Sequence, residues 1–285
     1  MSERVSLTVA LSLVAAFLYA VSNVLEQGEA QQMPGEYSLR PSLIVRLAAR
    51  RRWLIGFVAD AGGYVVSAGA LAIGAVVFVA PILSLGLLIS MLLGALVEHR
   101  RVPIGDWISA FLLCGGLVLF LFEVSPTGGG AVAPARRWAF AAPGIVLVIL
   151  ILVVLARRAP NATRSALLGV AAAVAFASGA VLTKAFVHFL GEGPVAWAPH
   201  WEPYAMAVAI LGGLLLVQSA FQAGSLAASV AGIEATEPLV SVVLGVTLLH
   251  ERVALDSPTR VASVAVACVA VVWALVSLAR SENRE

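Results

Sequence analysis

Long apolar segments recur along the whole chain and constrain its fold more than any other feature. Each is about twenty residues long, the length that an α-helix needs to cross the hydrocarbon core of a bilayer. Of the 285 residues, 61% are hydrophobic and only 12% are charged, about half the charge of an average soluble domain. We therefore predict an all-α polytopic membrane protein with nine transmembrane helices, at Ser6–Leu25, Trp53–Ile73, Ala75–Val97, Ile104–Phe122, Trp138–Ala156, Ser165–Val187, Pro203–Gln222, Ala227–Leu249 and Pro258–Ala279.

A sequence repeat relates the first and sixth of these segments. Six of the fifteen residues at positions 11–25 are identical to the residues 157 positions later, where composition alone would give roughly two. The identical residues are Leu11, Ala15, Ala16, Ala20, Val24 and Leu25, which reappear as Leu168, Ala172, Ala173, Ala177, Val181 and Leu182. The same offset aligns Pro81 with Pro238 and Ser84 with Ser241.

The repeat predicts two halves of four helices, at residues 1–124 and 165–285. Residues 125–164 then hold a glycine-rich linker and one central helix. Because the central helix adds one crossing, the second half begins on the opposite side of the membrane and the halves form an inverted pair. Inverted repeats enclose a site near the bilayer midplane and alternate its access, which is typical of secondary transporters.

Arginine residues predict the orientation of the chain. Twelve arginines fall on one side of the predicted helices and five on the other. By the positive-inside rule the richer side faces the cytoplasm. We expect a multi-pass protein of a bacterial cytoplasmic membrane, with its N-terminus outside and its C-terminus inside. The segment Ser42–Arg52, on the richer side, is expected to form an amphipathic interfacial helix.

A set of residues in both halves forms a loose pattern: Trp53, Gly56, Gly63, Tyr64, Ala70, Leu71, Pro81 and Glu98 in the first half, Gln218, Phe221, Leu226, Pro238 and His250–Arg252 in the second half, and Cys114–Gly116. With these residues, the layout resembles the drug/metabolite transporter superfamily (EamA-like), and most closely its NIPA-type magnesium-transporter branch. It implies the inverted-repeat fold and transport of a small solute, with Mg²⁺ as an alternative substrate. The branch typically has Gly-Glu followed by Asn three residues later, where this chain has Gly63-Tyr64 and Ser67.

Ionisable residues inside apolar helices are costly and default to functional candidates. Asp60, Glu234, Glu237 and Lys184 meet this condition, although Lys184 could also snorkel to the headgroups or pair with an acidic residue. Glu234 and Glu237 lie three residues apart and therefore share a helix face. Glu26 is expected at a solvated helix end.

Polar and aromatic residues complete the candidate substrate or ion site. Gln218, Gln222, Tyr64 and Ser67 are expected to shape the cavity, although interhelical packing is an alternative for each. Pro81 and Pro238 are candidate hinges, because a proline frees a backbone carbonyl and kinks a helix.

Several function classes lack their motifs. The chain has no phosphate-binding loop and no His-Glu-x-x-His sequence, so we expect no enzyme, no cofactor and no nucleic-acid partner. No metal ligand set can be assigned from the sequence. The expected partners are the lipid bilayer and a small-molecule or ion substrate, and a homodimer is compatible with the pattern. A non-transporting membrane subunit of a cell-envelope complex is the alternative function.

Overall fold

The computed structural model describes residues 2–73, 76–99, 101–124, 127–253 and 256–281. Within these ranges the chain forms ten α-helices and one short 3-10 helix, and nine of the α-helices are long and apolar enough to span a membrane. The nine are α1 (Ser2–Ala30), α3 (Arg51–Ile73), α4 (Val76–Glu98), α5 (Ile104–Val124), α6 (Ala135–Ala156), α7 (Asn161–Glu192), α8 (Glu202–Gln222), α9 (Leu226–Leu249) and α10 (Pro258–Ser281). The expectation of nine helices long and apolar enough to span a membrane is confirmed for the described residues.

Helix α7 is the central element of the bundle and α6 is the peripheral one. In the most apolar stretch of α7, 72% of the residues are buried, against 6% in α6. Helix α6 packs on α7, and most of its large side chains, such as Phe140, face outward, whereas Trp138 is buried. The run of small residues in α7 allows its backbone to approach α8 and α9 closely.

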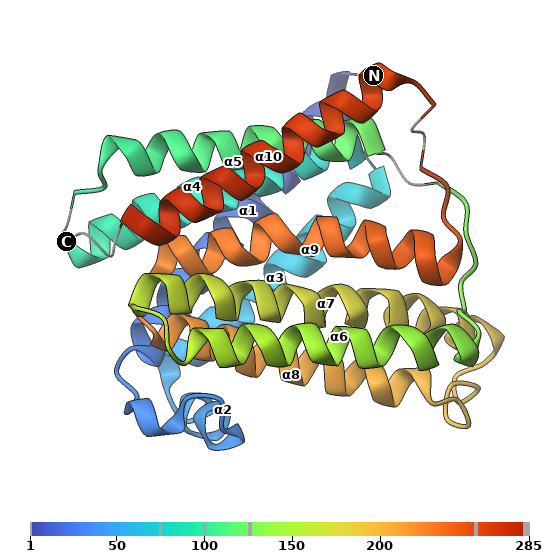
Figure 1. Ribbon diagram of the computed structural model, residues 1–285, viewed down its shortest axis with the longest axis horizontal. Coiled ribbons are helices and arrows are strands. Elements are labelled where there is room, and N and C mark those ends of the chain that lie inside the picture. The colour runs from blue at the N-terminus through green and yellow to red at the C-terminus, as the bar shows by residue number, and fades with distance from the viewer. Residues whose placement is uncertain (1, 74–75, 100, 125–126, 254–255, 282–285) are drawn as a thin grey trace.

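Corresponding helices of the two predicted halves pack alike. Helix α1 packs on α3 and α4, and α7 packs on α8 and α9. The fourth helices of the halves, α5 and α10, pack mainly on each other and lie side by side in Figure 1. Gly116 of α5 allows this approach, since a Cβ there would lie 2.8 Å from a methyl group of Val271. This packing agrees with the predicted division into two related halves. The inversion of one half relative to the other stays a prediction.

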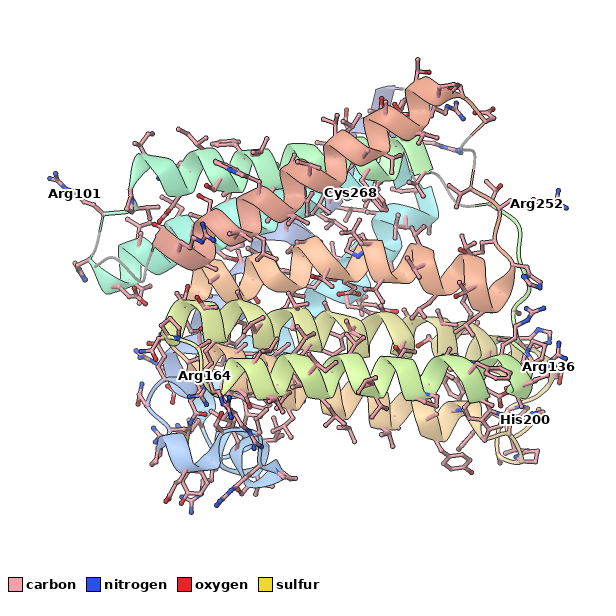
Figure 2. The ribbon with its side chains drawn as sticks, viewed as in Figure 1. Arg101, Arg136, Arg164, His200, Arg252 and Cys268 are labelled. Atoms are coloured by element: carbon pink, nitrogen blue, oxygen red, sulfur yellow. The ribbon has the colours of Figure 1, made fainter. Side chains whose placement is uncertain are left out.

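The short helix α2 (Pro41–Ala48) marks one end of the bundle, which we call the α2 end (Figure 1). Leu43 and Leu47 are buried, and α2 packs on α3 and α8. The short helix expected over Ser42–Arg52 is found at Pro41–Ala48, with Leu43 and Leu47 packed on the protein and Val45 exposed, and its place at the membrane interface stays a prediction. Figure 2 shows Arg101 and Arg164 at the α2 end and Arg136 and Arg252 at the opposite end, as the arginine pattern predicts.

Two helices are longer than we predicted by more than three residues. Helix α1 continues five residues past Leu25, to Ala30, and α7 runs from Asn161 to Glu192 instead of from Ser165 to Val187. The predicted boundary in α1 is wrong because polar residues beyond Leu25 have partners in the protein. Gln27, for example, donates a hydrogen bond to the carbonyl of Gly224 at 3.1 Å.

Candidate functional site

Four acidic side chains, Glu26, Asp60, Glu234 and Glu237, form what we call the acidic cluster. They come from α1, α3 and α9, and Asp60, Glu234 and Glu237 lie near the middle of their helices. The charge of Asp60 acts on both Glu26 and Glu237, and the charge of Glu237 acts on Glu234. The structure thus brings three of the predicted site residues within electrostatic range of one another, across the boundary between the two halves.

Asp60 is an exposed residue within a packed stripe of α3. Trp53, Gly56, Gly63 and Ser67 are buried and recur every three or four residues on the face that Asp60 shares. Asp60 therefore points toward the protein side of α3 and yet stays accessible to solvent. An accessible carboxylate inside a buried stripe is the arrangement expected of a residue that lines an internal opening.

Glu234 and Glu237 occupy the middle of α9, directly before Pro238. Both side chains are half-buried. Because proline has no N–H, Pro238 gives no hydrogen bond to the carbonyl of Glu234 one turn earlier. Backbone and side-chain oxygens are thus available at the same level of α9. Pro81 occupies the interior of α4 in the same way, so both candidate hinges lie inside membrane-spanning helices.

Three of the four carboxylates in the acidic cluster have no partner. Among the described residues, none forms a hydrogen bond or an ion pair with the carboxylate of Asp60, Glu234 or Glu237. The same residues contain no group of three or more His, Cys, Asp or Glu side chains close enough to hold a metal ion. The negative charge of the cluster is therefore dispersed over several positions.

Ser67 faces the interior of the bundle and Tyr64 does not. The Ser67 hydroxyl donates to the carbonyl of Tyr64 at 2.9 Å and lies 3.2 Å from the hydroxyl of Tyr19 in α1. Gly63 permits this contact, since a Cβ there would lie 2.9 Å from the Tyr19 ring. Tyr64 itself is 66% exposed and shares the outward face of α3 with Val65. Tyr19, a neighbour of Asp60 and Glu234, takes the place near the acidic cluster that we expected for Tyr64.

Gln218 joins the two halves through a buried hydrogen-bond network, which we call the Gln218 network. The indole of Trp53 donates to Oε1 of Gln218 at 3.0 Å, and Nε2 of Gln218 donates to Oε2 of Glu26. The Ser22 hydroxyl donates to the other Glu26 oxygen at 3.2 Å. The expectation of a solvated Glu26 is wrong, because its side chain is buried against α3 and α8. Gln218, a polar residue within an apolar helix, was the sequence signal for this network, but nothing in the sequence pointed to its partners.

Gln222 lies at the α2 end and holds the link between α1 and α2. Its Nε2 donates to the carbonyls of Met33 and Pro34 at 3.0 and 2.8 Å. It therefore fixes a surface segment and lies apart from the acidic cluster.

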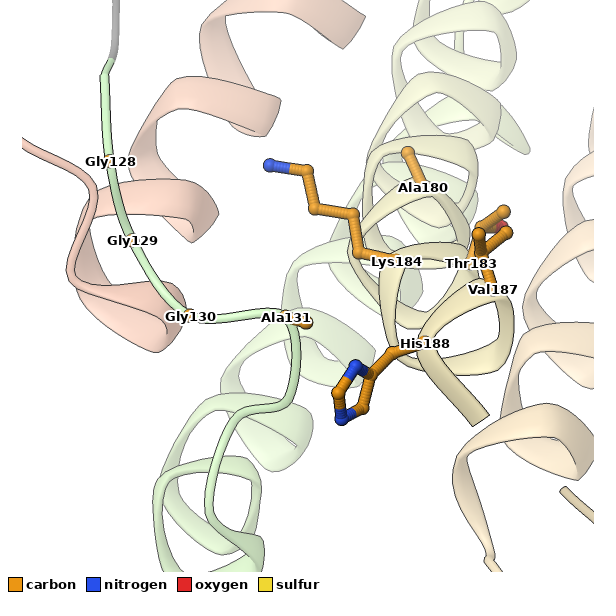
Figure 3. A pocket seen from close by; sticks show the side chains of 9 residues that line it. All are labelled: Gly128, Gly129, Gly130, Ala131, Ala180, Thr183, Lys184, Val187 and His188. Atoms are coloured by element: carbon orange, nitrogen blue, oxygen red, sulfur yellow. The ribbon is translucent and has the colours of Figure 1, made fainter. Parts of the chain in front are cut away.

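Lys184 lies toward the opposite end of the bundle, away from the acidic cluster. Its ammonium group pairs with the carboxylate of Glu251, just past the end of α9. Lys184 borders a shallow hollow of about 520 Å³ between α7 and the residue 128–131 segment (Figure 3). The lining residues are Gly128, Gly129, Gly130, Ala131, Ala180, Thr183, Lys184, Val187 and His188. Of the two alternatives for Lys184, the structure favours the ion pair over snorkelling.

Comparisons with known proteins assign no activity. No family model matches the chain, and no solved structure matches it. An uncharacterised protein of Corynebacterium glutamicum is 27% identical over 247 residues, which cover 86% of each chain. This stretch is longer than either predicted half, so the similarity extends over parts of both.

Proposed function

We propose that the protein is a secondary-active transporter that moves a small, positively charged solute, or a solute together with protons. The observation that carries the proposal is the acidic cluster. Its Asp60, Glu234 and Glu237 carboxylates lie at mid-span in helices of both halves and, among the described residues, have no basic partner. Such residues cost free energy on insertion and mark substrate or ion pathways.

The arrangement of the carboxylates favours mobile cations. Mg²⁺ requires near-octahedral oxygen ligands close together. No group of three acidic side chains among the described residues is close enough to hold it. A proton needs only one carboxylate and an organic cation spreads its charge, so both suit the dispersed cluster better. Mg²⁺ stays as the alternative substrate.

Alternating access between two halves is the proposed mechanism. It is supported by the repeat at an offset of 157 residues and by the like packing of α1 with α3 and α4 and of α7 with α8 and α9. Inverted halves would rock around the acidic cluster while Pro81 and Pro238 allow α4 and α9 to bend. The layout of the drug/metabolite transporter superfamily, which the sequence resembles, has this organisation. The arginine-rich α2 end would face the cytoplasm of a bacterial cell.

Neutralising Glu237 tests the proposal directly. Purified protein in proteoliposomes is assayed for uptake of putrescine, tetraethylammonium and Mg²⁺, with and without a pH gradient. We expect uptake of at least one of these cations above that of empty liposomes, and its loss in Glu237→Gln. Glu192→Gln is the matched control, because this carboxylate is exposed at the end of α7 and should leave uptake unchanged.

Two outcomes would contradict the proposal. Full uptake in Glu237→Gln would remove this residue from the mechanism. Absence of uptake for every cation by well-folded protein would favour the non-transporting membrane subunit instead.

A further inference from the structure

Polar contacts between the two halves gather at the α2 end. Gln27 and Gln31 of α1 both donate to the carbonyl of Gly224, at 3.1 and 2.9 Å, in the turn between α8 and α9. The backbone N–H of Leu39 donates to the Ser219 hydroxyl at 3.0 Å. The Gln218 network lies next to these contacts, further into the bundle. It connects α8 to α1 and α3.

The Gln218 network has one defined hydrogen-bond direction. An indole N–H can only donate, so Trp53 requires Gln218 to present its amide oxygen. The amide nitrogen of Gln218 must then donate, and Glu26 must accept. Trp53, Gln218 and Glu26 are 3%, 0% and 5% exposed, so water does not replace these bonds while α8 stays in place.

The repeat provides an internal comparison for this network. At the offset of 157 residues, Trp53 corresponds to Ile210, Gln218 to Ala61 and Glu26 to Thr183. Ile210 is 41% exposed and Ala61 is exposed. The Thr183 hydroxyl donates to Gly179 within its own helix at 2.8 Å. The corresponding positions are therefore less buried than the Gln218 network, and the one polar side chain among them, Thr183, bonds within its own helix.

We propose that the Gln218 network is the gate that closes the α2 end, with Gln218 as its positioning residue. The inference rests on the proposed alternating access. Opening this end requires α8 to leave α1 and α3, which breaks the bonds of Gln218 to Trp53 and Glu26. The counterparts Ile210, Ala61 and Thr183 form no corresponding network, so the gate at the α2 end has no equivalent at the positions that the repeat aligns with it.

The gate is also linked to the acidic cluster. The Cγ of Glu26 lies against Gly56, where a Cβ would be only 2.9 Å away. Asp60 follows Gly56 by one helical turn, and its charge acts on Glu26. A cation that reaches Asp60 therefore changes the electrostatic field at the acceptor of the gate, so that occupation of the site and opening of the α2 end are connected.

Cysteine accessibility tests the gate. The reporter is Ser241→Cys, which shares a face of α9 with Glu234, in a background where the free Cys114 and Cys268 are changed to serine. A membrane-impermeant maleimide is applied to vesicles of each orientation. Val45→Cys, exposed on α2, shows in a parallel sample which side of the vesicle carries the α2 end.

We expect the reporter to react from the opposite end and to be protected from the α2 end. Gln218→Met preserves the side-chain length but leaves the Trp53 N–H and the Oε2 atom of Glu26 without partners in the closed state, while Ser22 still donates to Oε1. Labelling from the α2 end should rise about ten-fold, the shift expected from losing two buried hydrogen bonds. Asn23→Ala is the matched control, because it removes a 3.2 Å hydrogen bond to Ser90 within one half.

Trp53→Phe provides a second test that preserves an aromatic ring. It removes the indole N–H together with the five-membered ring that carries it, leaves the bond between Gln218 and Glu26 in place, and should raise labelling from the α2 end by a smaller factor. The gate is refuted if unmodified protein labels equally from both ends, or if Gln218→Met and Trp53→Phe, both folded by size-exclusion chromatography, label like Asn23→Ala. Failure of transport in the uptake assay leaves these labelling results standing, so the two proposals fail separately.

Discussion

Substitution of Gly169 by alanine should destabilise the central contact between α7 and α9. A Cβ at this position would lie 2.5 Å from the backbone oxygen of Ser229. Ordinary contacts of this kind are about 3.5 Å, so the two helices would have to separate by about 1 Å. Gly232 of α9 approaches α7 in the same way, with a Cβ position 2.7 Å from the carbonyl of Ala166. The contact therefore involves two rigid backbones, and no flexible side chain can move to relieve it.

The expected cost follows from overpacking a close contact. Inserting a methyl group into a well-packed interior costs about 1–3 kcal/mol. For a chain of this size, each kcal/mol corresponds to roughly 2–4 °C in Tm, so Gly169→Ala should lower Tm by roughly 2–12 °C. Any gain in helix propensity from replacing glycine, at most about 1 kcal/mol, offsets part of this loss.

Thermal unfolding of purified protein in detergent measures the effect, with tryptophan fluorescence as the signal. Gly144→Ala is the matched control, since a Cβ there has no atom within 4 Å and lies on the peripheral helix α6. Gly144→Ala should melt at or slightly above the temperature of the unmodified protein. The reasoning is refuted if Gly169→Ala is as stable as Gly144→Ala.

Two further substitutions test other parts of the structure. Ser225 caps the N-terminus of α9 by accepting the N–H of Ala228 at 3.0 Å, so Ser225→Ala should cost about 0.5–2 kcal/mol in thermal unfolding, whereas Ser225→Gly should cost only a few tenths. Lys184→Met leaves the Glu251 carboxylate, whose side chain is 9% exposed, without its ion pair, and should cost about 1 kcal/mol, because the 54% exposed ammonium group is already screened by water. Cation uptake by Lys184→Met should be normal in the proteoliposome assay, and loss of uptake at normal stability would contradict the separation of Lys184 from the acidic cluster.

The membrane-spanning helices could be predicted from the sequence because the bilayer imposes a simple requirement on length and polarity. The ends of the helices were predicted less accurately than the helices themselves. Glu26 and Gln27 look like residues of a solvated helix end, yet α8 and the turn after it bury both side chains. Their partners, Gln218 and Gly224, are almost two hundred residues away in the chain. Only tertiary packing brings these groups together, and no local pattern contains that information.

For the same reason, the sequence identified some residues of the candidate site and missed others. Asp60, Glu234 and Glu237 stand out because a carboxylate in an apolar helix is conspicuous, and the structure brings them into one cluster. Lys184 is equally conspicuous in the sequence, but it lies near the end of a longer helix than predicted and pairs with Glu251. Tyr19 looks like an ordinary aromatic residue of an apolar helix until its contact with Ser67 is seen.

The pairing of α5 with α10 has a consequence for biosynthesis. Helix α5 ends at Val124, while its main partner begins only at Pro258. At a synthesis rate of about 5–20 residues per second, α5 waits on the order of ten seconds in the membrane before α10 exists. During this time the face of α5 around Gly116 must be covered by lipid or by an insertion factor. Helix α5 therefore reaches its final packing only after α10 has entered the membrane.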